Sequence, residues 1–304
     1  MKEVKNLVKR NVLVFARDRA AVFFSVLTML IVLGLMILFL GDMNSDSIVA
    51  VLAQMGGKRN PDEDKANASY LVQVWTLAGI LLSNSVTVTM TVMGNMIGDE
   101  SNNRLASFYV TPIKRLQIAL GYVISAWSIG TVMCLFTLGV AELYLLVSGQ
   151  TILTGMECLQ LAGMIVLNTF MYSAIAYLVA LFVHSESAWS GILTVVGTLV
   201  GFVGGIYLPL SAMPENVATI LKGFPFLHGA AMMRVVCTKQ AIETTFTGLP
   251  EEVTEEFMES MGITVMLDGN EVTFAMQAAY ILVLSFLAIL AAAFISSKRA
   301  VRDR

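Results

Sequence analysis

The chain contains 304 residues, of which 57% are hydrophobic and 13% are charged, and its formal net charge is −3. Soluble globular domains carry about 25% charged residues, so this composition excludes an ordinary soluble protein, and the scarce cations leave no basic surface for nucleic acid. The composition predicts an all-α polytopic membrane protein in which residues 1–304 form a single transmembrane domain.

The first segment, residues 1–19, predicts an amphipathic helix at the membrane surface. Apolar residues at helical spacing share one face, and cations cover much of the remainder. We expect the apolar face to lie among acyl chains and the cations near anionic headgroups; an ordinary basic flank of the first span is the alternative. The apolar residues are Val4, Leu7, Val8, Val12 and Phe15, and the cations are Lys2, Lys5, Lys9 and Arg10.

Six apolar segments are long enough to cross a bilayer, because a spanning helix needs about 20 predominantly apolar residues. They are residues 20–40, 70–97, 117–141, 158–183, 188–208 and 274–295. Six crossings place both termini on one side of the membrane. Of the 19 Lys and Arg residues, 13 would lie on that side, which the positive-inside rule identifies as the cytoplasm.

The second of these segments carries a polar stripe. Asn84, Thr87, Thr91 and Asn95 fall within an arc of about 80° on a helix. A polar stripe avoids lipid, so it faces either a water-filled substrate path or another helix, to which it would form hydrogen bonds. The sequence leaves both interpretations open.

Residues 98–116 form the only sizeable cytoplasmic loop expected between spans. Leu105, Phe108 and Tyr109 have the i, i+3, i+4 spacing of a short helix, which Pro112 would end. An exposed aromatic face on such a helix would suit a partner protein. A simple loop whose aromatic residues lie at the membrane interface is the alternative.

The fifth segment contains glycines at every fourth position, Gly197, Gly201 and Gly205. Small residues at this spacing allow another helix backbone to approach closely. We therefore expect this glycine stripe to form a close helix contact, either within the chain or across a dimer.

Residues 209–273, between the fifth and sixth spans, begin with a stretch that is apolar but interrupted. Pro209, Pro214 and Pro225 break it at intervals too short for a crossing. We expect short re-entrant helical segments that enter the membrane, return, and pack on the bundle, because irregular backbone at that depth needs protein or water around it.

A small outer α+β appendage is predicted before the last span. A helix would begin at Pro250, with Glu251 and Glu252 in its first turn. The segments ITVML and EVTF flank Asp268-Gly269-Asn270, which is a hairpin signal. About 35 residues are too few for a separate core, so the appendage must rest on the bundle or on a partner.

The sequence contains no recognisable catalytic, metal or cofactor motif. A phosphate-binding loop, a Gly-rich dinucleotide fingerprint and a His-Glu-x-x-His pair are all missing. Cys134, Cys158 and Cys237 have no zinc spacing, and the pattern does not decide whether Cys158 and Cys237 pair. Ser190 and His184 are the nearest approach to an intramembrane hydrolase. We expect no catalytic site, bound metal or cofactor in this chain.

In the order of these parts, the chain resembles the membrane subunits of ATP-binding-cassette exporters of the type-2 permease family over its whole length. The matching residues are Arg17-Asp18, then Glu100, Arg104-Leu105, Thr111-Pro112 and Arg115, and finally Gly205-Ile206-Tyr207-Leu208-Pro209-Leu210 with Met213-Pro214. The chain departs from the family at Asn103-Arg104-Leu105, where a Gly-Thr pair before Leu is common.

The resemblance implies a transport subunit that binds a separate ATPase. Two ATPases, which would hold ATP and Mg, would drive two permeases, as a homodimer or a heterodimer, whose second and fifth spans line the substrate path. The loop would be a coupling helix, and the implied coupling residues are Glu100, Arg104, Leu105, Phe108, Tyr109 and Pro112. The cargo would be a drug-like small molecule, a peptide or a lipid, exported across a prokaryotic plasma membrane.

A secondary transporter or channel that does not use ATP is the main alternative. Such proteins carry ionisable residues and broken helices within their spans. Here Glu142 and Glu157 fall at the outer ends of spans, which predicts interfacial positions rather than a proton relay. Flux that depends on voltage or pH without ATP would favour this alternative.

Overall fold

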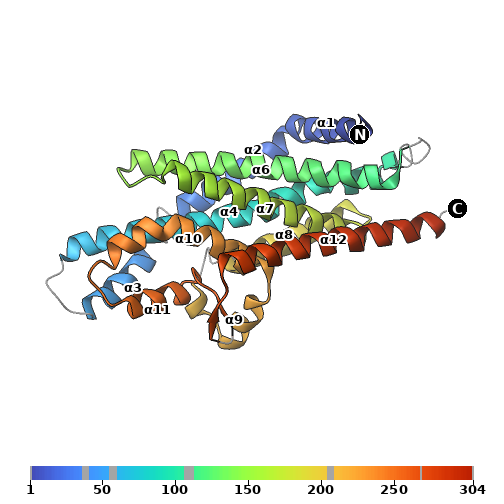
Figure 1. Cartoon of the computed structure of the whole chain (residues 1–304). Coiled ribbons are helices and arrows are strands. Elements are labelled where there is room, and N and C mark those ends of the chain that lie inside the picture. Colours follow the sequence, from blue (N-terminus) through green and yellow to red (C-terminus); the bar gives the residue numbers. More distant parts are fainter. Residues whose placement is uncertain are drawn as a thin grey trace.

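Long helices that lie side by side form almost all of the described chain (Figure 1). The computed structural model describes residues 2–35, 41–54, 60–105, 113–203, 209–267 and 269–302. The α-helices are α1 Lys2–Arg17, α2 Arg19–Leu35, α3 Gly41–Gln54, α4 Pro61–Ser101, α6 Arg115–Val147, α7 Gly155–Ala180, α8 Glu186–Val203, α9 Glu215–Lys222, α10 Pro225–Thr245, α11 Glu251–Ser260 and α12 Phe274–Arg302. Both ends of the chain lie at the same end of the bundle (Figure 1).

Helix α4 is the longest element and the centre of the bundle. The Asn60 side chain caps its N-terminus by accepting a hydrogen bond from the Asp62 amide at 3.2 Å, and Pro61 occupies its first turn. Its 41 residues extend over about 60 Å, twice the ~30 Å hydrocarbon core of a bilayer. The helix continues beyond both ends of the predicted span 70–97, because charges that exclude those turns from lipid do not prevent them from being helical.

Burial and hydropathy run in opposite orders along the bundle. Helices α3, α6, α7, α8 and α10 all contact α4. Among the four candidate spans α4 is the least apolar, yet 83% of its best 18-residue window is buried; α12 is the most apolar, and only 22% of its window is buried. In a water-soluble protein the most apolar helix would be the most buried one, because burial removes apolar surface from water. The reverse order, with the most apolar helix on the outside, is expected of a protein whose outer helices contact lipid.

The described residues contain four helices that are long and apolar enough to cross a membrane, α4, α6, α7 and α12. A fifth is obtained if α9 and α10 are counted as one broken span. Of the other expected spans, residues 20–35 lie in α2 and residues 188–203 lie in α8. The remaining residues of these two spans, 36–40 and 204–208, lie outside the described part of the chain. The count of six crossings stays a prediction.

The segment after Pro209 is more helical than expected. Pro209 and Pro214 are the N-caps of the 3-10 turn η2 (Leu210–Ala212) and of α9, and Pro225 lies in the first turn of α10. Proline is favoured in the first turn because its missing N–H would be unpaired there anyway, and a proline at the N-cap precedes the helix and does not interrupt it. The expectation of only short helical segments in this proline-interrupted stretch is therefore wrong for α10, which is 21 residues long and packs against α4.

The bend between α9 and α10 is 84° and is held by side chains. The ring nitrogen Nε2 of His228 lies 2.9 Å from the carbonyl oxygen of Lys222. The Tyr280 hydroxyl on α12 donates to the carbonyl of Gly223 at 2.7 Å, and the His228 and Tyr280 rings meet edge to face with centroids 5.0 Å apart. The carbonyl groups exposed by the bend are thus satisfied by protein, as a broken helix in a membrane requires.

Helix α11 and a two-stranded hairpin, β1 (Met266–Leu267) and β2 (Asn270–Glu271), precede α12. The strands are antiparallel, with Met266 opposite Glu271. This part rests on the bundle: the Trp75 indole on α4 donates to the carbonyl of Met261 at 2.9 Å, and the buried Arg234 guanidinium lies 4.5 Å from the Trp75 ring centroid. Its position outside the membrane stays a prediction.

Two N-terminal helices differ from expectation. The buried residues of α1 are Leu7, Asn11 and Phe15, and α1 contacts α6, α4 and α2. Part of the face that we expected among acyl chains is therefore covered by protein. Helix α3 lies in a stretch expected to be an outer loop, and it packs on α4 through Ile48 and Leu52, a pair at i, i+4 spacing.

Candidate functional site

A buried carboxylate at the C-terminal end of α4 joins three helices. Asp99 accepts hydrogen bonds from Arg10 Nη1 and Nη2 on α1, at 2.5 and 2.7 Å, and from the Tyr122 hydroxyl on α6, at 2.6 Å. Arg104 Nη1 adds a longer ion pair of 3.7 Å. Only 4% of the Asp99 side chain is exposed. A carboxylate buried this deeply is stable only when it is paired and hydrogen-bonded, so α1 and α6 are held to this point.

The hydrogen bond to Asp99 also raises the pKa of Arg10, which lies outside the candidate spans. A pKa that is higher in the folded state than in the unfolded chain stabilises the folded state, and this stabilisation is fully present at every pH below the pKa of the group in the unfolded chain. Because an arginine is protonated throughout the accessible range, the Arg10 charge in this pair is not lost within it.

Next to this pair, α1 fits closely onto α6. A Cβ atom on Gly121 would lie 2.8 Å from Leu7 Cβ, so only glycine permits this approach. The Asn11 amide donates to Ser125 Oγ at 3.3 Å and accepts from Arg10 Nη1 at 3.0 Å. Asn11 therefore continues the polar contact of Asp99 along the interface between α1 and α6.

The same end of α4 is joined to the turn between α7 and α8. Glu186 accepts hydrogen bonds from Ser101 Oγ at 3.0 Å and from Asn102 Nδ2 at 3.3 Å. His184 Nδ1 lies 2.8 Å from Glu100 Oε1. The last turn of α4 is therefore connected on one side to α1 and α6 and on the other to the start of α8.

Trp189 fixes the first turn of α8 against α4. Its indole N–H donates to the carbonyl of Met90 at 3.2 Å, and its ring covers Gly94, where an added Cβ atom would lie 3.1 Å from Nε1. The side chain is buried. A tryptophan needs both a partner for its N–H and a surface for its ring, and α4 supplies the two together.

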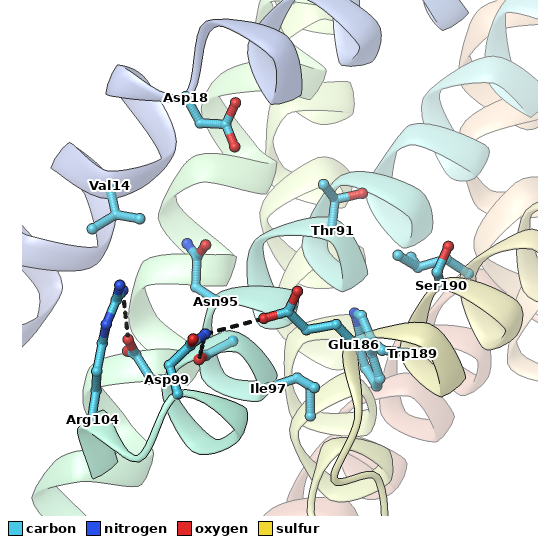
Figure 2. A pocket seen from close by; sticks show the side chains of 14 residues that line it. Val14, Asp18, Thr91, Asn95, Ile97, Asp99, Arg104, Glu186, Trp189 and Ser190 are labelled. Carbon is cyan, nitrogen blue, oxygen red and sulfur yellow. Dashed lines mark hydrogen bonds and ion pairs between the residues drawn. The ribbon is translucent and has the colours of Figure 1, made fainter.

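A cavity of about 380 Å³ opens between α1, α4 and α8 beside this cluster (Figure 2). Its walls include Asp18, Thr91, Asn95, Asp99, Arg104, Glu186 and Ser190. The Nδ2 atom of Asn95 is buried and has no hydrogen-bond partner among the described residues. A buried unpaired amide requires a partner, and an amide that lines a polar cavity is placed to bind water or a ligand.

A second cavity, of about 320 Å³, lies between α2, α4 and α8 and shares Thr91 and Leu193 with the first. Asn84 and Thr87 also line it. Asn84 donates to Thr137 Oγ1 on α6 at 2.9 Å, and the hydroxyls of Thr87 and Thr91 donate to carbonyls of their own helix. Asn84 therefore forms a hydrogen bond to another helix, and each of the four stripe residues lines at least one of the two cavities.

The structure describes half of the implied coupling residues. Glu100 contacts His184, Arg104 reaches Asp99 while 65% of its side chain remains exposed, and Leu105 is buried. Phe108, Tyr109 and Pro112 lie outside the described residues.

Of the glycine stripe, Gly197 and Gly201 are described, and Gly205 lies outside the described residues. Gly197 faces α4, where an added Cβ atom would lie 3.8 Å from Thr87 Cγ2, and Gly201 is buried. The approach at Gly197 is therefore within the chain and is not close enough to require glycine. Closer approaches occur at Gly121, Gly94 and Gly229; a Cβ atom on Gly229 would collide with Asn168 Oδ1.

Sequence reasoning missed Arg10, Asn11, Asp99, Tyr122 and Glu186 as members of one cluster. Asn11 carried a signal, since it stands between Leu7 and Phe15 in the middle of an apolar face. Asp99 and Arg10 are 89 positions apart, and no local pattern connects them.

Two acidic groups at the other end of the bundle accept hydrogen bonds from backbone amides just before α7. Glu142 accepts from the Leu153 amide at 3.0 Å, and Glu157 accepts from the Thr154 amide at 2.8 Å and from Gln240 Nε2 at 2.6 Å. Within the described ranges, no group of three or more His, Cys, Asp or Glu residues could hold a metal ion. All three cysteines are free, so Cys158 and Cys237 are not paired.

Together these observations define a multi-pass membrane protein whose central helix carries polar cavities and a charged cluster at one end. Residues 57–296 match the model of the family described as "ABC-2 family transporter protein". The chain therefore belongs to this family of transporter membrane components. No curated protein matches it.

We predict that Asp99→Asn lowers the free energy of unfolding by about 1–3 kcal/mol, the usual cost of losing hydrogen bonds to a buried charged group. Thermal unfolding in detergent measures this. The control is Glu100→Gln, whose pair with His184 is more exposed and should cost under about 1 kcal/mol. Arg10→Gln in the Asp99→Asn background should cost less than in the wild type; additive effects would contradict the Arg10–Asp99 coupling.

We also predict that the cavity at Thr91 is wet. In a Cys158→Ser background, Thr91→Cys should react with a charged, membrane-impermeant thiol reagent about tenfold faster than Leu290→Cys, because thiolate reactivity requires a polar surrounding. Leu290 on α12 is 64% exposed in the isolated chain but should face lipid. Equal labelling of the two cysteines would show that Thr91 is not in a water-filled cavity.

Proposed function

We propose that this chain is the permease subunit of an ABC exporter in a prokaryotic plasma membrane, driven by a separate ATPase. The observation that carries the proposal is the cluster around Asp99. It connects the segment that leaves α4, where Arg104 is exposed, to α1, α6 and α8 at once. A surface that responds to an ATPase must be mechanically connected to the helices that move.

A separate ATPase is required because this sequence contains no phosphate-binding loop. Membership of the ABC-2 family supports an ATPase partner and a multimeric assembly. In the working unit two ATPases hold ATP and Mg and two permeases, identical or different, form the path. This chain then binds no cofactor of its own.

The ATPase would bind the segment from Glu100 to Pro112, with Phe108 and Tyr109 as its apolar contacts. A displacement there reaches α4 directly through the chain. It reaches α1 and α6 through Asp99 and reaches α8 through Glu186. For ATP to change the state of the permease, the ATPase must bind the inward-open and outward-open states with different affinities.

The cargo path would run along α4 and α8. The two cavities that meet at Thr91, of about 380 and 320 Å³, have the volume of small-molecule sites, about 300–1,000 Å³. Their walls combine hydroxyl and amide groups with apolar side chains, and charged groups line one end of the first cavity. Such walls suit an amphipathic drug-like molecule, a peptide or a lipid. A second permease opposite α4 and α8 would complete the walls.

Both termini would lie in the cytoplasm. The ends of the described chain share one end of the bundle (Figure 1), and 13 of the 19 Lys and Arg residues belong to the segments assigned to that side. The appendage that contains α11 and the hairpin would then face outward.

The proposal is tested by purifying the tagged chain gently from its native membranes. We expect an ATPase to accompany it in stoichiometric amount, and its ATP hydrolysis to depend on the permease. Arg104→Ala with Phe108→Ala should weaken this association at least about tenfold, since aromatic residues and arginine are typical of interface hot spots. The bundle itself should melt at an unchanged temperature.

The matched control removes one cation and one exposed apolar residue elsewhere, Lys65→Ala with Leu267→Ala. It should leave the association intact. Equal loss in both double variants, or ATPase association that is insensitive to Arg104 and Phe108, would refute the coupling assignment. ATP-independent flux through a folded permease without an ATPase would refute the exporter.

A further inference from the structure

An apolar groove of about 720 Å³ lies between α6, α7 and α12, away from the cavities of the proposed path. Its walls are formed by residues such as Leu120, Val123, Trp127, Phe170 and Ile289. None of its lining residues lines either of the cavities along α4 and α8. It opens beside α12, the most exposed candidate span.

The groove is polar at one end. Lys114 and Arg115, at the start of α6, line that end, and Lys114 is exposed. On α12 the groove reaches Ser296, whose hydroxyl oxygen is buried without a hydrogen-bond partner among the described residues. Lys298 and Arg299 follow within one turn of the same helix. Lys114, Arg115 and the Ser296 hydroxyl thus line the same end of an apolar channel.

The length of the groove matches one leaflet of a bilayer. From Arg115 to Trp127 it follows 13 residues of α6, and the rise between these two residues is about 18 Å. Half of a ~30 Å hydrocarbon core is about 15 Å. A phospholipid whose acyl chain fills the groove, with the end of the chain at the middle of the membrane, would therefore have its headgroup at the basic end.

We propose that the groove binds one anionic phospholipid of the leaflet on the side of the termini. The acyl chain lies along Leu120, Val123 and Trp127, and the phosphate is bound near Lys114 and Arg115 with Ser296 as a hydrogen-bond donor. Basic pockets between membrane helices select anionic headgroups in this way. The site is independent of the proposed ATPase and cargo, and it holds α6, α7 and α12 together at their lipid face.

A lipid fits this groove better than a partner helix does. The walls are apolar over their whole length and polar at a single end, which is the pattern of a phospholipid rather than of an amphipathic helix with a polar stripe. The charge at that end is positive, which favours an anionic headgroup over a zwitterionic one.

The fluorescence of Trp127 reports directly on what occupies the groove. Of the protein's three tryptophans, Trp75 and Trp189 are buried, whereas Trp127 is partly exposed in the groove. Brominated acyl chains quench tryptophan fluorescence only on close contact. We expect brominated phosphatidylglycerol in detergent micelles to quench this emission at an about tenfold lower mole fraction than brominated phosphatidylcholine does. Trp127→Phe should remove the quenching.

Two pairs of variants identify the site. Lys114→Gln with Arg115→Gln should abolish the preference for phosphatidylglycerol, an about tenfold loss, whereas Lys2→Gln with Lys5→Gln removes the same charge from α1 and should change nothing. Ala293→Phe fills the groove and should weaken quenching by both lipids. Ala279→Phe, at an exposed position of α12 outside the groove, should not.

Thermal unfolding of each variant shows whether it is folded. If the double variant Lys114→Gln with Arg115→Gln does not fold, Ala293→Phe alone tests the site. Equal quenching by the two lipids overturns the proposal, as does quenching that survives Trp127→Phe. Loss of the preference in the Lys2 and Lys5 control overturns it too. No quenching by either lipid would also overturn the proposal, because protein, such as a second copy or a partner, would then cover the groove.

Discussion

The buried carboxylate of Asp99 is the constraint on which the arrangement of this end of the molecule depends. Removing a charge from water is expensive unless it is paired and hydrogen-bonded, and Asp99 obtains its partners from α1 and α6 rather than from its own helix. The two helices therefore cannot separate from α4 without exposing or unpairing the charge. The exposed Arg104 lies at the edge of the same cluster, so a partner that binds there acts on a group already shared by three helices.

The rest of the bundle is organised by what must be kept away from lipid. The polar residues of α4 are enclosed by neighbouring helices, and the more apolar helices lie outside. Enclosure leaves two small cavities along one face of α4 and a bent segment, α9–α10, whose backbone is satisfied by His228 and Tyr280. The apolar groove lies elsewhere, between α6, α7 and α12. Transport and lipid contact would thus use different helices of the bundle.

Much of this architecture follows from the sequence because apolar runs of sufficient length specify the bundle helices. The predicted spans 117–141, 158–183 and 274–295 correspond to α6, α7 and α12. Proline was harder to interpret, since Pro225 begins α10 rather than interrupting a helix. Helix α3 was missed because its apolar face is short. The Asp99 cluster could not be predicted, because its partners come from distant parts of the chain and only folding brings them together.

The most direct test of this account is amide hydrogen exchange of the permease in its ATPase complex, with and without a non-hydrolysable ATP analogue. If the end of α4 transmits the state of the ATPase, nucleotide should change exchange in residues 98–105 and also in α1 and at the α7–α8 turn. Asp99→Asn should remove the change in α1 and leave that in residues 98–105. A nucleotide effect confined to residues 98–105 in the unsubstituted protein would contradict the account.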